Sequence, residues 1–442
     1  MKKALWLCLL LALLLTAAAA LADGEPKVSF SSTTGKVNGP LDYTIELKST
    51  AAFSETTDVT LVCNTDKTTY TATFAAGATQ AWVTVPTVEV EKRTNYIYDI
   101  QAGSGYQVAS KSNRFTLQVF PLPHVRFSSS AYIGYVGKSL AVTVSCSNGS
   151  SVVSGKHFQL RDQTGRLYAE ADWKNTGGKL TFRIDVTSDM EGARFFSVWW
   201  NGFRVTEIGT GYAAITDLSR KVIKQVNTEE PYIAITIDCC YYDANTDKIL
   251  DVLDKYGIKC TFFMTGYYIR TFPESAKKIL ARGHEIGNHT TNHRKMTQWS
   301  NVSQQLSQMH TPVVEMEELM GIRVRLYRPP YGDHNDKLTA MVRSDGMEVI
   351  MWTIDSHDWD DEYKNKPDKV IERDKRGVGP GYIILHHLGG YHTAEILDVV
   401  IPYYMDELGL QPVTITELMA LEGRTVPDLP IEDTLTQIPE GM

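Results

Sequence analysis

The hydrophobic pattern of this chain changes its period near residue 229, and the change limits the folds open to its second half. Residues 232–237 form a near-continuous apolar run, as expected of a strand that is buried on both faces. Apolar residues then recur at helical spacing over 247–256, and a second apolar run follows at 260–264. This strand–helix–strand order predicts a parallel sheet covered by helices, either open or closed into a barrel.

The same alternation continues towards the C-terminus. Helices are expected over 275–282 and 303–320, and short strands at 325–327, 348–352 and 382–385. In parallel sheets of this kind, functional side chains gather at the carboxyl ends of the strands. Polar residues that directly follow these strands are therefore the first candidates for chemistry.

The first half of the chain has a different pattern, with short runs that alternate apolar and polar residues and no convincing helix. The stretch PKVSFSS at 26–32 returns as PHVRFSS at 123–129, which indicates an internal repeat. A repeat of this length matches the usual size of a β-sandwich domain. We therefore expect two immunoglobulin-like sandwiches, at 25–121 and 122–218.

The role of these sandwiches depends on where their aromatic residues lie. Aromatic side chains in alternating strands belong to the core more often than to the surface, so a spacer is expected. Exposure of Trp199, Trp200 and Tyr212 would instead make the second sandwich a module that binds carbohydrate or cell wall.

The N-terminus has the layout of a secretory signal peptide. Lys2 and Lys3 precede an apolar stretch at 5–15, and small residues then lead to Ala22. We expect 1–22 to be removed after export, which predicts a protein that is secreted or associated with the cell wall.

Composition narrows the remaining possibilities. A net charge of -8 without a long basic block argues against nucleic acid as a partner. Beyond the N-terminus no apolar run is long enough to span a membrane, so no transmembrane anchor is expected after cleavage. Five cysteines follow Cys8, an odd and scattered set that does not suggest a disulfide framework. The Pro-, Glu- and Thr-rich residues 424–442 are expected to form a flexible tail.

Several predicted strands of the second half are followed by residues that can carry chemistry. Asp238, Arg328, Asp358 and His387 each come shortly after such a strand. Turn residues are often polar. A set of carboxylates, histidines and an arginine at several strand ends is nevertheless more than the formation of turns explains. The sequence therefore predicts an active site at the carboxyl edge of the sheet.

A histidine pair points to a metal ion. His289 and His293 are four residues apart, so on a helical turn both imidazoles would project from one face. A hydrolytic metal site also needs a third protein ligand and an open position for water. The reaction further needs a base, a stabiliser for the oxyanion and an acid for the leaving group.

The second half resembles the polysaccharide deacetylase family of the NodB type, the fourth family of carbohydrate esterases. The resemblance covers about 190 residues, at 229–423, and follows the motif order of the family. The matching stretches are TIDCC at 236–240 for T-F-D-D-G, NHTTNH at 288–293 for H-[ST]-x-x-H, RPPY at 328–331 for R-x-P-Y, DSHDW at 355–359 for D-x-x-D-W, and LHH at 385–387 for L-x-H. The resemblance implies that the part of the chain after the two sandwiches has an α/β fold, a distorted (β/α) barrel.

The resemblance also implies a role for each matched residue. Asp238 would be the general base, with Arg328 orienting it, and His289 and His293 would be metal ligands. The third ligand of the family is the second Asp of T-F-D-D-G, and here that position is Cys239.

The remaining roles concern the oxyanion and the leaving group. The backbone N–H of Tyr331 would help to hold the tetrahedral oxyanion, and Trp359 would line the acetyl pocket. Asp358 would fix His387, the general acid, while the adjacent His386 would point to the other side of its strand and be structural.

The cysteine at position 239 leaves three interpretations open. Cys239 could be a thiolate ligand in a Cys-His-His site suited to zinc. Alternatively, two histidines could hold the ion weakly with help from Asp243, or the domain could bind sugar without metal. Because the other polar roles are kept, we favour an active site with a divalent metal, Zn²⁺.

The sequence therefore predicts a secreted, metal-dependent hydrolase that removes acetyl groups, N-acetyl in particular, from a polysaccharide. Peptidoglycan and chitin-like chains are the expected partners. The alternative is a catalytically impaired protein of the same fold that binds glycan as a scaffold. A metal-independent amide hydrolase that acts on small molecules fits less well with export and with the attached sandwiches.

Overall fold

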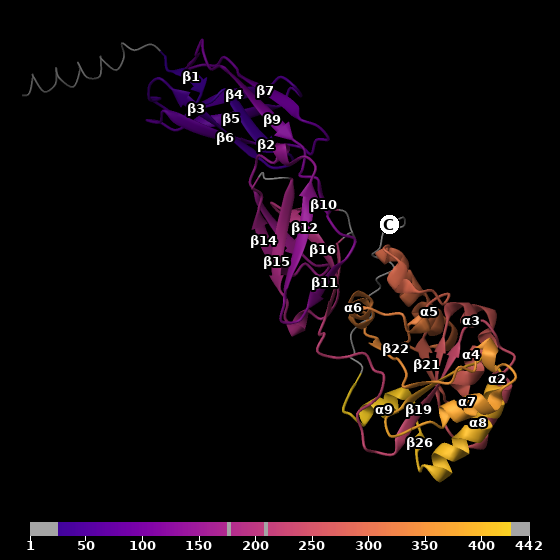
Figure 1. Ribbon diagram of the computed structural model, residues 1–442. Coiled ribbons are helices and arrows are strands. Elements are labelled where there is room, and N and C mark those ends of the chain that lie inside the picture. Colours follow the sequence, from indigo (N-terminus) through magenta and orange to yellow (C-terminus); the bar gives the residue numbers. More distant parts are fainter. Residues whose placement is uncertain (1–24, 175–177, 207–210, 426–442) are drawn as a thin grey trace, which may run out of the picture.

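The computed structural model describes residues 25–174, 178–206 and 211–425, so the predicted signal peptide and nearly all of the predicted tail lie outside the described residues. Two β-sandwiches and an α/β domain follow one another in a bent row (Figure 1). No helix in the described ranges is both long enough and apolar enough to cross a membrane.

The first sandwich packs a sheet in the order β6-β3-β1-β8 against a sheet in the order β2-β9-β7-β4-β5. Alternating side chains such as Val28, Leu47 and Val59 point between the sheets and form its core. Its strands are β1 (Lys27–Phe30), β2 (Thr34–Asn38), β3 (Tyr43–Ser49), β4 (Thr57–Cys63), β5 (Thr69–Phe74), β6 (Gln80–Val85), β7 (Thr94–Ile100), β8 (Gln107–Val108) and β9 (Arg114–Phe120).

The second sandwich repeats this topology. Its sheets run β10-β12-β15 and β11-β18-β16-β13-β14, which match β1-β3-β6 and β2-β9-β7-β4-β5 strand for strand. In both copies the second strand pairs in parallel with the last one. The sequence repeat is therefore a structural repeat, and the immunoglobulin-like assignment stays a prediction. The strands are β10 (Val125–Phe127), β11 (Tyr132–Tyr135), β12 (Ser139–Cys146), β13 (His157–Arg161), β14 (Leu167–Asp172), β15 (Lys179–Asp185), β16 (Gly192–Trp200), β17 (Phe203–Arg204) and β18 (Gly211–Thr216).

A buried asparagine joins the two sandwiches. The backbone N–H of Asn38 donates to Ser154 Oγ at 2.7 Å, and its side-chain amide donates to the carbonyl oxygens of Pro121 and Ser151. Its side-chain oxygen accepts from the backbone N–H groups of Val153 and Ser154. The polar groups of Asn38 are thus satisfied by hydrogen bonds within the described chain, and Leu41 of the first sandwich adds an apolar contact with the core of the second.

The α/β domain is built on a parallel sheet in the order β23-β22-β21-β20-β19-β25-β24, with β26 beside β19. Residues 223–226 bridge its two ends, because Ile223 pairs with Ile350 and Gln225 pairs with Tyr382. The sheet therefore closes into a distorted barrel, as predicted. Its strands are β19 (Tyr232–Cys239), β20 (Thr261–Met264), β21 (Glu285–Asn288), β22 (Leu326–Tyr327), β23 (Glu348–Val349), β24 (Ile354–Asp355), β25 (Ile383–His387) and β26 (Gln411–Pro412).

Alternate side chains of the barrel strands enter two different cores. Ala234, Phe263 and Ile383 fill the interior, which α9 closes at one end with Ile415 and Leu418. The other side of each strand packs against the surrounding helices. These are α2 (Thr246–Lys255), α3 (Gly266–Thr271), α4 (Pro273–Ala281), α5 (Val302–Met320), α6 (Asp336–Ser344), α7 (Pro367–Asp374) and α8 (Thr393–Pro402). The closing helix α9 covers Ile415–Ala420.

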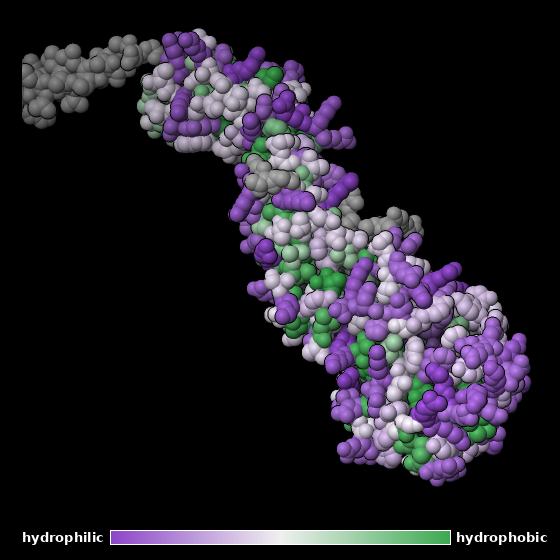
Figure 2. Space-filling model, viewed as in Figure 1, coloured by the Kyte–Doolittle hydropathy of each residue, from purple (hydrophilic) through white to green (hydrophobic). Residues whose placement is uncertain are grey.

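The second sandwich shares a hydrophobic core with the barrel. Phe195 and Tyr212 of the sandwich belong to the same buried cluster as Met341 and Val342 of α6, and the Tyr212 hydroxyl lies 3.2 Å from Ser344 Oγ. Figure 2 shows hydrophobic residues gathered on the lower part of this sandwich, towards the barrel. Trp200 and Tyr212 are buried, so neither is the surface platform that was the alternative to a core role.

Candidate active site

A cavity of about 730 Å³ opens at the carboxyl end of the barrel strands. Its walls come from loops that follow five of those strands (β19, β21, β22, β24 and β25) and from the residues just after β23, which the parallel order brings to one edge. The lining residues are Asp238, Cys240, Tyr241, Tyr242, His293, Tyr331, Trp352, Asp355, Trp359, Leu385, His387, Gly389 and Tyr391. A pocket of this size is typical of a site for a small molecule or a segment of a polymer.

Asp238 lies at the end of β19 and is held by a buried arginine. Arg328 Nη1 donates to Asp238 Oδ1 and to Thr236 Oγ1, each at 2.9 Å. The guanidinium lies over the ring of Phe263, 4.1 Å from its centroid. Burial opposes the Asp238 charge, but the positive charges around it, that of Arg328 among them, outweigh this effect and hold the pKa of Asp238 below its ordinary value. Asp238 is therefore an ionised carboxylate in a fixed orientation.

His289 and His293 lie close together, although on a turn and not on the helical turn that their spacing predicted. β21 ends at Asn288, and Thr290 and His293 both have positive φ, at 68° and 54°. The Asn288 side chain accepts from the Thr290 N–H, and Thr290 Oγ1 accepts from the His293 N–H. These side-chain bonds fold the turn so that the two rings lie 4.9 Å apart between centroids.

The third residue of this cluster is Cys240. Ligand atoms of Cys240, His289 and His293 all lie within 4.8 Å of one another. Cys239 is fully buried among the apolar side chains outside the barrel, together with Ile235 and Ile237. The prediction of Cys239 as a metal ligand is therefore wrong, because side chains alternate along a strand and only the residue after it faces the same side as Asp238.

Asp243 does not supply a ligand either. Its carboxylate accepts hydrogen bonds from Thr246 Oγ1, from the Tyr268 hydroxyl and from Ser275 Oγ at 2.6 to 2.8 Å. These bonds tie the loop after β19 to the first turn of α2, to α3 and to α4. The Asp243 carboxylate thus has its hydrogen-bond partners in the protein and holds this loop in place.

The cluster fits a divalent metal ion. His289 Nδ1 lies 2.8 Å from the carbonyl oxygen of Arg328, which can only accept, so the proton is on Nδ1. His289 Nε2 is buried, makes no hydrogen bond within the described chain and lies 3.3 Å from Asp238 Oδ2, so its lone pair is available to a metal ion. Burial lowers the pKa of both histidines, that of His293 to about 3, so both rings are neutral as ligation requires. Two imidazoles and a thiol are a donor set that suits zinc.

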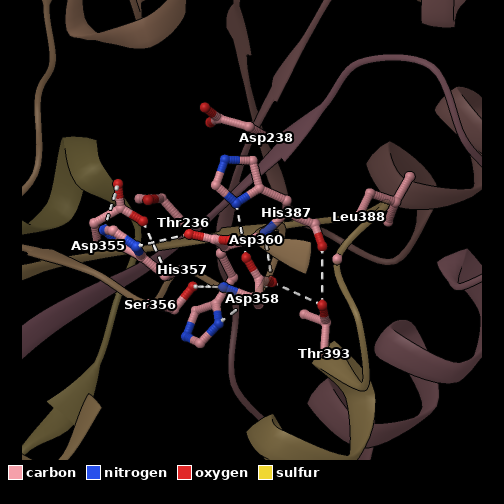
Figure 3. A network of polar contacts seen from close by, with 12 residues as sticks. Thr236, Asp238, Asp355, Ser356, His357, Asp358, Asp360, His387, Leu388 and Thr393 are labelled. Carbon is pink, nitrogen blue, oxygen red and sulfur yellow. Dashed lines mark hydrogen bonds and ion pairs between the residues drawn. The ribbon is translucent and has the colours of Figure 1, made fainter. Parts of the chain in front are cut away.

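A second charged pair lies beside Asp238, because His387 of β25 is its register neighbour in the parallel sheet. His387 Nδ1 lies 2.8 Å from Asp358 Oδ1, and the His387 N–H donates to Asp358 Oδ2. Figure 3 shows the other ring nitrogen of His387 pointing towards Asp238. Burial disfavours the imidazolium, but the Asp358 carboxylate more than offsets it and raises the pKa of His387. The pKa of Asp358 is lowered to about 2, so this buried group stays ionised.

His386 lies on the opposite side of β25, in the layer between strands and helices. Its Nε2 is 3.5 Å from Asp374 Oδ2, and both side chains are fully buried. Burial lowers the pKa of His386 to about 4 and raises that of Asp374 well above its ordinary value. Burial therefore favours the neutral form of both side chains.

Aromatic residues surround the opening, and the sequence singled out only part of them. Tyr331 and Trp359, both predicted to bind substrate, line the cavity and are largely exposed. Tyr241, Tyr242 and Tyr391 line it as well and were not predicted. The first two directly follow Cys240, so their position in the loop after β19 was the signal available in the sequence.

An ionised carboxylate, a candidate metal site and a histidine–aspartate pair around one cavity are the groups that a metal-assisted hydrolase needs. A family model described as polysaccharide deacetylase matches residues 225–350. The peptidoglycan-N-acetylmuramic acid deacetylase PdaC of Bacillus subtilis is 34% identical over 193 residues, which are 44% of this chain and 40% of that protein. A peptidoglycan-N-acetylglucosamine deacetylase of Bacillus cereus is 30% identical over 203 residues, 44% of this chain and 91% of that protein.

The chain belongs to the polysaccharide deacetylase family, since it covers nearly the whole of the Bacillus cereus relative at this identity. It spans about two fifths of the length of PdaC. Among solved structures, a pseudoenzyme of carbohydrate esterase family 4 from Bacillus anthracis is 28% identical, with 46% of this chain and 73% of that chain covered and a TM-score of 0.43. The family model begins at residue 225, so both sandwiches lie outside the matched range.

Proposed function

We propose that this chain is a secreted or cell-wall-associated hydrolase that removes N-acetyl groups from an acetylated cell-wall glycan. The observation that carries the proposal is the joint placement of Asp238, the Cys240–His289–His293 cluster and the Asp358–His387 pair around one cavity. The named deacetylases among the relatives act on peptidoglycan, which makes peptidoglycan the first substrate to test.

The proposed chemistry divides between Asp238 and His387, which are neighbours on the paired strands β19 and β25. Asp238, ionised and oriented by Arg328, takes a proton from the attacking water. His387, protonated and held by Asp358, gives a proton to the departing sugar nitrogen as the C–N bond breaks and acetate leaves. Tyr331, with φ at 59°, is proposed to direct its backbone N–H at the oxyanion, and Trp359 to line the acetyl pocket.

Cys240, His289 and His293 would hold the metal ion, for which zinc is proposed. When bound, such an ion acts as a Lewis acid that polarises the acetyl carbonyl and favours deprotonation of water. The Nδ1 of His289 keeps its ring oriented through the carbonyl oxygen of Arg328. The same arginine therefore orients the base with its side chain and a ligand with its backbone.

The test is acetate release from peptidoglycan and from N-acetylglucosamine oligomers by the zinc-loaded mature protein. We expect release by the wild type and a loss of at least about 100-fold in Asp238→Asn, which keeps the shape of the base and removes its charge. Glycan binding by the wild type without any acetate release would support the scaffold alternative instead. One observation favours that alternative. Burial raises the pKa of the Cys240 thiol well above its ordinary value, which disfavours the thiolate that a metal ion would need as a ligand.

A further inference from the structure

Exposed aromatic side chains are concentrated at the mouth of the cavity. Four of the large hydrophobic side chains that are exposed in the described chain line this cavity, namely Tyr241, Tyr242, Tyr331 and Trp359. A fifth, Tyr267, packs edge-on against Tyr241 with ring centroids 5.3 Å apart. A gathering of exposed apolar surface at one opening marks a place where a ligand binds.

Most of these rings are already occupied by neighbouring groups. The Tyr241 hydroxyl donates to the carbonyl oxygen of Asn292 at 3.1 Å. Tyr331 lies 4.5 Å from the ring of His293 between centroids, and the Lys295 ammonium lies over its face. Tyr391 has its hydroxyl on Asp361. These contacts fix the rings and cover part of their surface.

Tyr242 differs from them. Its side chain is 66% exposed, and no aromatic ring or cation is found stacked on it among the described residues. A Cβ placed on Gly389 would come within 2.7 Å of Tyr242 Cδ2, so the ring rests directly on the backbone of the loop after β25. The ring is therefore supported from below by the loop that also carries His387, while its surface remains open to solvent.

The position of Tyr242 relates it to the substrate. It lies two residues beyond Cys240, and Gly389 lies two residues beyond His387, so the ring lies across the two loops that bear the proposed metal site and the proposed acid. Asp238 is buried at the base of the cavity, whereas Tyr242 stands at its rim. A glycan whose acetyl group reaches Asp238 must leave the cavity past such a rim residue.

We propose that Tyr242 is a stacking platform for a sugar ring next to the one that reacts, which makes the enzyme prefer oligosaccharides to shorter substrates. The apolar C–H face of a pyranose fits the flat face of a tyrosine, and its hydroxyl groups remain in water. The inference rests on the proposed function, because it assumes that the cavity receives a glycan.

The test compares substrates of different length. kcat/KM for acetate release is measured with N-acetylglucosamine oligomers of two and five units, using the mature zinc-loaded wild type, Tyr242→Ala and Tyr242→Trp. We expect the five-unit to two-unit ratio to fall about tenfold in Tyr242→Ala, mainly through KM, and to be retained in Tyr242→Trp, which keeps a flat ring. Trp82→Ala, on the exposed surface of the first sandwich, is the matched control and should leave the ratio unchanged.

A ratio that stays the same in Tyr242→Ala overturns the proposal, whether or not the overall rate drops. If the wild type releases no acetate, calorimetric titration of the wild type and Tyr242→Ala with the five-unit oligomer tests whether Tyr242 binds a sugar ring. Binding that weakens about tenfold in Tyr242→Ala supports the platform and removes only the hydrolase proposal. Equal binding by wild type and Tyr242→Ala, or no binding by either, overturns the platform.

Discussion

Two adjacent cysteines differ completely in their surroundings, and this difference can be tested. Cys240 Sγ belongs to the histidine cluster, whereas Cys239 Sγ is packed among core side chains and lies 3.8 Å from the carbonyl oxygen of Ile237. We expect Cys240→Ala to weaken zinc binding by at least about 100-fold, because one of three protein ligands is lost. Cys239→Ala should keep stoichiometric zinc and lose about 1 kcal/mol of unfolding free energy.

Zinc content after dialysis, measured by elemental analysis beside a denaturant titration, separates the two variants. Loss of zinc in Cys239→Ala with retention in Cys240→Ala would contradict the arrangement described above. Loss in neither would exclude a thiolate ligand and leave the two histidines as the protein part of the site.

The acid–base pair gives a pH prediction. His387 must be protonated to act as an acid, so kcat/KM should fall as pH rises through its pKa, which Asp358 raises above the ordinary value. In Asp358→Asn the effect of burial remains while the carboxylate charge is gone. The alkaline limb should therefore move to lower pH, and kcat should fall by about 10²- to 10⁴-fold.

The pH–rate profile checks this prediction, with Asp360→Asn as control. Asp360 lies 3.8 Å from His357 and belongs to the same loop, but it does not contact the His387 ring. An unchanged alkaline limb in Asp358→Asn would mean that a group other than His387 supplies the proton.

At the scale of elements, the loop between β25 and α8 determines where Asp358 lies. A Cβ on Gly390 would come within 2.3 Å of Asp358 Oδ2 and 2.5 Å of Thr393 Oγ1, and Thr393 Oγ1 itself donates to that carboxylate oxygen (Figure 3). Gly390→Ala must therefore displace the carboxylate or the loop. We expect at least a tenfold loss in kcat/KM and about 1–3 kcal/mol of lost unfolding free energy.

Gly379→Ala is the matched control for this element. Gly379 has ordinary φ, and its nearest neighbour to an added Cβ is 3.8 Å away. Its activity should equal that of the wild type, and its unfolding free energy should change by less than about 0.5 kcal/mol. Full activity in Gly390→Ala would show that the Asp358 position tolerates displacement.

Elements with a long periodic pattern could be predicted from the sequence, whereas elements that depend on tertiary contacts could not. Residues 303–320 predict the helix found as α5 (Val302–Met320), because nearly five turns of pattern are present. The helix α6 was missed. Its buried residues include the polar Thr339, Arg343 and Ser344, whose burial a pattern of apolar residues does not reveal. The strand expected at 348–352 is shorter in the structure, where β23 covers Glu348–Val349 and Ile350 forms an isolated bridge to Ile223.

The candidate site shows the same division. Motif positions singled out six residues that the structure brings together, and their roles stay predictions. Asp238, His293 and His387 line the cavity, and His289, Arg328 and Asp358 lie against these lining residues. The error at Cys239 arose because a motif position was followed without the alternation of side chains that was applied to His386 and His387. The turn at His293 was not predictable from spacing, since side-chain hydrogen bonds from Asn288 and Thr290 determine it.

At the scale of the whole molecule, the two junctions between domains differ in chemistry. The first depends on hydrogen bonds of Asn38, whereas the second is a continuous hydrophobic core between Phe195, Tyr212 and α6. A polar junction can be removed with little cost, because its groups return to water. An apolar junction leaves side chains exposed when it is cut.

Two truncations test this difference. A chain that begins at residue 122 should keep the thermal midpoint of the barrel and stay monomeric. A chain that begins at residue 222 loses the partners of Met341 and Val342 on α6, each of which contributes about 1.5–3 kcal/mol when fully buried. We expect this shorter chain to unfold at a clearly lower temperature and to aggregate in size-exclusion chromatography.

Tyr212→Ala in the full chain should lose about 3 kcal/mol of unfolding free energy without aggregating, because the rest of the sandwich still covers the helix α6. A stable, monomeric barrel from residue 222 would instead mean that the sandwich contributes nothing to its stability and acts only as a spacer.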